Sequence, residues 1–311
     1  TGLAVLGTAV AAWGAWYAWA HLPEPALTFG GLLETSRFTY ALSLVVLLAT
    51  VLCLLASQGY LRRENILSGE YHALLLWCAC GLLLMLRATE LLTVFVSLEL
   101  FSLCLYSLAA YHRRLTIATE GALKYFLMGA FVSAFILYGV ALVFGATGST
   151  RLIDIGQALG AMPEVPVTAS LGILMIVAGF GFKMSVVPFH AWSPDTYQGA
   201  PSPFVAFLSV APKVASALVL YRVLESVVLG APATAVKWSG VVAVLSVLSM
   251  LVGNLLALVQ RDVLEQQLQA SARWRWRSPT TGSRSCAAGN PRAERAMPAP
   301  TSASSKRRSP R

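Results

Sequence analysis

The chain has 311 residues, of which 57% are hydrophobic and only 12% are charged, and its mean hydropathy is +0.67. Soluble domains carry about 25% charged residues, so this composition excludes an ordinary soluble enzyme. Of the net charge of +9, residues 264–311 contribute +8 through ten Lys/Arg and two Asp/Glu, so residues 1–263 are near neutral and the basic pI does not indicate nucleic-acid binding.

Apolar segments of roughly 20 residues recur along the chain, a pattern typical of a polytopic α-helical membrane protein. The first ends in aromatic residues, as expected at a membrane interface. Because Thr1 already lies in an apolar run, we expect the sequence to begin inside a longer protein. The eight predicted spans are residues 2–20, 38–57, 71–86, 91–111, 121–144, 167–189, 203–224 and 238–259, with a loop containing Asp154 before the sixth.

Paired arginines follow the second and fourth predicted spans, and Arg261 follows the eighth. Cytoplasmic loops carry an excess of Lys and Arg. This side is therefore predicted to be cytoplasmic.

Residues 264–311 form a separate region that has no apolar helical face and is rich in Arg, Ala, Ser and Pro. One interpretation is a disordered basic tail that contacts anionic lipid. The other is an out-of-frame or artificial terminus, since GC-rich DNA read out of frame gives such a residue mixture. The predicted domains are thus a transmembrane domain, 1–263, and a basic tail, 264–311.

Three ionisable residues lie deep inside predicted spans. Glu99 is about 13 Å from either end of its span at the helical rise of 1.5 Å per residue, and a carboxylate there costs on the order of 3 kcal/mol. Lys183 and Lys213 carry a similar cost. Such residues are expected to face protein or water and to be functional.

Two prolines accompany these lysines. Pro188 follows Lys183 by five residues and, lacking an N–H, is predicted to break the helix between residues 184 and 188. Broken helices at membrane depth are tolerated where they line a cavity or are buried in protein. Pro212 directly precedes Lys213 and is a second candidate hinge.

Two further candidates have open alternatives. Lys124 either joins a proton path, or snorkels or pairs with Glu120 at spacing i,i+4. His190 either relays protons or caps a helix end. Asp195, after Pro194, is predicted to hold a turn.

No nucleotide, metal or nucleophile motif is found in the sequence, and the four cysteines in apolar segments are interpreted as ordinary buried or lipid-facing residues. We therefore expect no catalytic residue, metal or cofactor in this chain. A row of groups of alternating sign remains, and it suits proton transfer because protonation of one member changes the affinity of the next. Its members are Glu99, Lys183, Lys213 and, as further candidates, Lys124 and His190.

Three stretches resemble the subunit N family of proton-translocating membrane subunits in bacterial NADH-quinone oxidoreductase, respiratory complex I. They are SLELFSLCLYSLAAY (97–111), ALKYFLMGAFVSAFILYGVALVFGATGS (122–149) and KMSVVPFHAWSPDTYQGAPSP (183–203). The resemblance covers about residues 1–263. The pattern PFHAWSPDTYQGAP is also similar to cation/proton antiporter subunits of Mrp type, so such a Na⁺/H⁺ antiporter subunit is the alternative function.

The resemblance implies that Glu99 is the family's essential glutamate, Lys183 the lysine of its broken helix and Lys213 the lysine of the next helix. It implies that association and separation of the Glu99–Lys183 pair gate proton passage. It also implies a multi-pass location in the bacterial inner membrane and other complex I membrane subunits as partners. NADH, FMN, iron–sulfur clusters and quinone would be bound by partner subunits.

The sequence departs from the family in two ways. Glu99 lies in the fourth predicted span, where the resemblance implies the fifth. The first inverted repeat, predicted spans three to seven, is present, whereas the similarity ends near Val263 and the second repeat is predicted to be missing. A non-pumping truncated fragment is therefore a further alternative.

Overall fold

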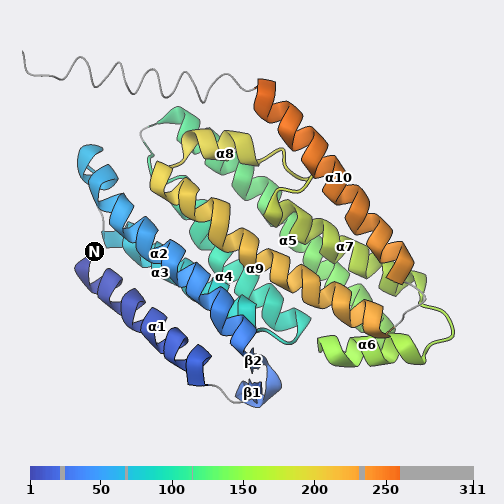
Figure 1. Ribbon diagram of the computed structural model, residues 1–311. Coiled ribbons are helices and arrows are strands. Elements are labelled where there is room, and N and C mark those ends of the chain that lie inside the picture. The colour runs from blue at the N-terminus through green and yellow to red at the C-terminus, as the bar shows by residue number, and fades with distance from the viewer. Residues whose placement is uncertain (22–24, 67–68, 114, 231–234, 260–311) are drawn as a thin grey trace, which may run out of the picture. The chain divides into compact units, whose positions relative to one another are not determined.

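The computed structural model describes residues 1–21, 25–66, 69–113, 115–230 and 235–259. Within them, eight helices are long and apolar enough to cross a membrane (Figure 1), which confirms the predicted all-α polytopic fold. The predicted tail and the predicted loss of a second repeat concern residues outside the described part. The eight long helices are α1 (Gly2–His21), α2 (Arg37–Arg63), α3 (Gly69–Arg87), α4 (Leu91–Ala109), α5 (Thr116–Thr147), α7 (Val167–Met184), α9 (Ser202–Gly230) and α10 (Ala235–Val259).

The buried core lies among α2, α3, α4, α5, α7 and α9. Long helix pairs hold it together: α5 packs along α7, α3 along α4, and α2 along α9. No residue of the apolar span of α10 is fully buried. Many large apolar side chains point outward instead, as expected of surfaces in contact with lipid.

The sixth predicted span is broken, as the sequence predicted, but it ends earlier than residue 189. Helix α7 stops at Met184 because Ser185 adopts the left-handed conformation (φ 59°, ψ 38°). The N–H groups of Ser185 and Val186 then satisfy carbonyls of the last turn. A cis peptide bond joins Val187 to Pro188, and the chain resumes as the short helix α8 (Ser193–Gly199).

The segment predicted as a loop after the fifth span contains a short helix, α6 (Leu152–Ala161), so that prediction was wrong. Leu152, Ile155 and Leu159 are buried, at the i, i+3, i+7 spacing of one helical face. This face packs against α9. Asp154 lies in the first turn, where a carboxylate stabilises the helix dipole.

A small β-hairpin between α1 and α2 was not predicted from the sequence. Its strands, β1 (Ala26–Thr28) and β2 (Leu33–Thr35), pair antiparallel around the short 3₁₀ turn η1 (Phe29–Gly31). Only three residues long, each strand is too short to give a detectable alternation of apolar and polar residues.

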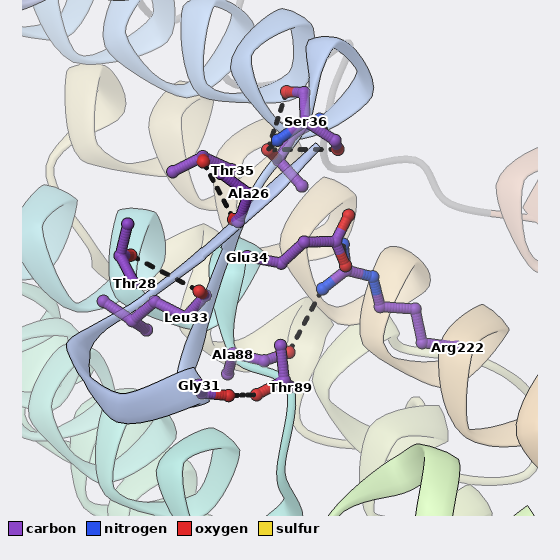
Figure 2. Close-up of polar contacts among 11 residues, drawn as sticks. Ala26, Thr28, Gly31, Leu33, Glu34, Thr35, Ser36, Ala88, Thr89 and Arg222 are labelled. Atoms are coloured by element: carbon purple, nitrogen blue, oxygen red, sulfur yellow. Dashed lines mark hydrogen bonds and ion pairs between the residues drawn. The ribbon is translucent and has the colours of Figure 1, made fainter. Parts of the chain in front are cut away.

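Hydrogen bonds and an ion pair fasten this hairpin to the helices (Figure 2). The Thr89 hydroxyl donates to the carbonyl of Gly31 at 2.6 Å. Arg222 of α9 pairs with the Glu34 carboxylate at 3.3 Å and donates to the carbonyl of Ala88 at 3.1 Å. One arginine thus joins the hairpin, the α3–α4 connection and α9.

Candidate functional site

Lys183 lies in the last turn of α7 and is only 4% exposed. Its Nζ donates to the hydroxyl of Ser102 at 2.8 Å and to that of Tyr106 at 3.2 Å. The same Nζ lies 5.5 Å from the centre of the Tyr106 ring and 5.9 Å from that of Phe101. The buried amine is therefore surrounded by hydroxyls and aromatic rings of α4.

Glu99 shares one face of α4 with both hydroxyls. Ser102 and Tyr106 follow it at positions i+3 and i+7, a spacing that stacks side chains along a helix. The Glu99 atom Oε1 is buried without a hydrogen-bond partner. Within the described residues no ion pair joins Glu99 to Lys183, so the predicted pairing of these two groups stays a prediction.

Lys213 lies in α9 and is half-buried, with Nζ 5.7 Å from the centre of the Tyr197 ring. The ring belongs to α8, so the lysine contacts the second half of the broken element. Helix α9 is continuous through Pro212. The role of Pro212 as a hinge stays a prediction.

Aromatic rings connect the surroundings of Lys183 with those of Lys213. Tyr106 meets Tyr125 edge-on at 4.7 Å, and Tyr125 stacks on Trp192 at 4.4 Å with an interplanar angle of 15°. Trp192 then meets Tyr197 edge-on at 6.3 Å. A series of rings therefore connects the two lysines: Tyr106 binds Lys183 through its hydroxyl, and Tyr197 faces Lys213 with its ring.

Lys124 forms ion pairs with Glu120 at 2.9 Å and with Asp195 at 2.7 Å. The predicted i,i+4 pairing is confirmed. Asp195 lies in the first turn of α8, so the turn predicted for it is a helix start. All three side chains are about half exposed, and the cluster ties α5 to α8.

His190 lies in the connection between the two halves of the broken element. Its carbonyl accepts hydrogen bonds from the N–H and the hydroxyl of Ser193, both at 3.0 Å. Its side-chain Nδ1 is buried without a hydrogen-bond partner. The backbone, and not the imidazole, thus supports the start of α8, and the proton-relay role stays a prediction.

Sequence reasoning missed Ser102 and Tyr106 as neighbours of Lys183. The available signal was their spacing from Glu99 in an otherwise apolar helix, because residues at i, i+3 and i+7 share one face. No cluster of three His, Cys, Asp or Glu that could hold a metal ion lies in the described part of the chain. The site offers a buried amine, a carboxylate and hydroxyls, which are groups that exchange protons.

A family model described as "NADH:quinone oxidoreductase/Mrp antiporter, TM" matches residues 88–267. The chain is 44% identical over 235 residues to NADH-quinone oxidoreductase subunit N 2 of Koribacter versatilis, which covers 76% of this chain and 46% of that protein. It is 41% identical over 242 residues to subunit N of Rhodospirillum rubrum, covering 78% and 49%. The chain thus spans about half the length of the relatives that it matches.

Solved structures agree with these matches. A chain of respiratory complex I from Thermus thermophilus superposes with a TM-score of 0.66 at 35% identity, covering 83% of this chain and 52% of that one. A chain of the Mrp complex from Dietzia has a TM-score of 0.64 at 18% identity, covering 73% and 43%. At this identity the second match indicates the fold alone.

Proposed function

Since the chain belongs to the NADH:quinone oxidoreductase/Mrp antiporter family of membrane proteins, we propose that it is part of a subunit N that translocates protons in a bacterial NADH-quinone oxidoreductase. The observation that carries this proposal is Lys183, an amine buried at a helix break beside the helix that bears Glu99. Burial of an amine in a membrane protein is energetically costly, and residues that carry this cost generally serve a function.

The proposed path begins at Glu99 and Lys183, which exchange between an associated and a separated state. Lys213 receives the proton next. It contacts Tyr197, the last ring of the series that begins with Tyr106 beside Lys183. Lys124 and His190 are further candidates for the path, Lys124 through its contact with α8. The break before Pro188 places Lys183 in the last turn of α7.

Redox chemistry is assigned to other subunits of the complex. They would bind NADH, FMN, the iron–sulfur clusters and quinone, and this chain would respond electrostatically to quinone reduction. Its direct neighbours would be other membrane subunits and the lipid of the bacterial inner membrane. The subunit N relatives, at 41–44% identity, favour this assignment over an Mrp-type antiporter subunit, for which the structural match is 18% identical.

The test uses the full-length protein in its assembled complex, reconstituted in vesicles. Glu99→Gln and Lys183→Met should each lower proton uptake per NADH oxidised, because each removes one proton-exchanging group. Glu70→Gln is the matched control, since Glu70 is exposed in the first turn of α3. Pumping that is unchanged by both site variants would refute the assigned roles. Proton uptake that requires Na⁺ efflux would favour the antiporter alternative.

A further inference from the structure

The amine of Lys183 donates hydrogen bonds to two hydroxyls of α4. The proposed exchange between Glu99 and Lys183 does not by itself explain these hydroxyls. We propose that Ser102 and Tyr106 are positioning residues that form a docking site for Lys183 when it is separated from Glu99, and that Gly129 makes room for the Tyr106 hydroxyl. This inference rests on the proposed function, because it assigns residues to one of the two states of the Glu99–Lys183 pair.

The Ser102 hydroxyl is fixed as a hydrogen-bond acceptor toward Lys183. Its own proton is used in a 2.5 Å hydrogen bond to the carbonyl of Leu98, one turn earlier in α4. Only its oxygen lone pairs remain for the amine, which approaches to 2.8 Å. Ser102 is fully buried, so water does not compete for this position.

Tyr106 is fixed by its surroundings. Its ring meets the rings of Tyr125 and Phe126 edge-on at 4.7 Å and 5.5 Å. Its hydroxyl occupies the space above Gly129 of α5, where a β-carbon would overlap it. The absence of a side chain at position 129 therefore lets the phenol oxygen reach a point 3.2 Å from the Lys183 Nζ.

The arrangement gives Lys183 two alternative sets of acceptors along one face of α4. The carboxylate of Glu99 lies one turn before the Ser102 hydroxyl and two turns before that of Tyr106. A lysine side chain is long and flexible enough to move between neighbouring turns. An unpaired buried amine is strongly unfavourable, and two hydroxyls reduce that cost, so the separated state becomes populated without opening the protein to water.

The test compares variants of the full-length protein in the assembled complex, with proton uptake per NADH oxidised as the readout. Tyr106→Phe removes one oxygen and keeps the ring, and Ser102→Ala removes the other hydroxyl. Because the loss of a hydrogen bond to a charged group weakens an interaction about tenfold or more, each variant should shift the balance between the two lysine positions by about that factor and lower pumping accordingly. Ser107→Ala is the control, because Ser107 makes the same bond to a carbonyl one turn earlier but is exposed.

Ser102→Thr distinguishes docking from packing. Threonine keeps the hydroxyl but adds a methyl group at a fully buried position, so a purely structural role predicts that threonine is worse than alanine. The docking role predicts instead that the threonine variant pumps protons better than the alanine variant. Gly129→Ala should lower pumping, because the added β-carbon overlaps both the hydroxyl and the ring of Tyr106 and displaces them from Lys183.

The outcomes separate failure of the docking site from failure of the proposed function. If Glu99→Gln and Lys183→Met lower pumping while Ser102→Ala and Tyr106→Phe do not, the docking site is refuted and the proposed function stands. If the Glu99 and Lys183 variants pump normally, the proposed function itself fails. If Ser102→Ala pumps better than Ser102→Thr at equal assembly, the hydroxyl has only a packing role.

Discussion

Helices α5 and α7 approach each other closely where two glycines face one another, and a methyl group added there should force them apart. A β-carbon on Gly139 would lie 2.7 Å from the carbonyl oxygen of Gly172, and one on Gly172 would lie 2.7 Å from that of Gly139. Both obstacles are backbone atoms, which cannot rotate away as a side chain can. We predict that Gly139→Ala destabilises the protein.

The expected change in the free energy of unfolding is the sum of two opposing contributions. Alanine in a helix is favoured over glycine by about 0.5–1 kcal/mol. Overpacking of a tight interface costs about 1–3 kcal/mol. Gly145→Ala, on the same helix, has open space around its β-carbon and brings only the first contribution. The difference between the two variants therefore isolates the packing cost, and we expect it to be about 1–3 kcal/mol.

The assay is a denaturant titration of the full-length protein in mixed micelles, which gives the free energy of unfolding. Gly145→Ala should leave this free energy equal to that of the wild type or slightly higher, and Gly139→Ala should lower it. Equal free energies for the two variants would refute the close contact between the α5 and α7 backbones.

Three further predictions concern contacts outside this interface. Arg222→Met leaves the Glu34 carboxylate and a backbone carbonyl without their donor and should lower the free energy of unfolding by about 1–3 kcal/mol. The double variant with Glu34→Gln should recover part of this lost free energy, because the unpaired charge is removed. Lys124→Gln should leave that free energy nearly unchanged, because its ion pairs are about half exposed and screened by solvent, and a clear loss of stability would show that the cluster is shielded. Ser249→Ala removes the acceptor of the Val187 N–H, so hydrogen exchange at Val187 should become faster while exchange in the α7 core does not.

The number of long helices and the position of the break were predictable because both depend on local sequence. Runs of about 20 apolar residues have few alternatives in a membrane. Pro188 removes a backbone donor wherever it stands inside a helix. Helix α6 was missed because its ten residues are too few to span a membrane and because Asp154 suggested a loop.

The candidate site was predictable in part. Glu99 and Lys183 are conspicuous because charges are costly in apolar segments. The hydroxyls that contact Lys183 come from a helix about 80 residues earlier in the chain, and only the packing of α4 on its neighbours brings them together. Serine and tyrosine are inserted into a membrane helix at a much smaller free-energy cost than a charged residue, so the sequence alone does not mark them as candidates.

Both halves of the broken element rest on the same helix. Helix α7 packs along α5 at Gly139 and Gly172, and α8 lies on the start of α5, fastened there by Lys124. Helix α5 therefore spans the break as a common support (Figure 1). The consequence is mechanical: the two sides of the break share one support, so the backbone on both sides is held in place although the element itself is interrupted.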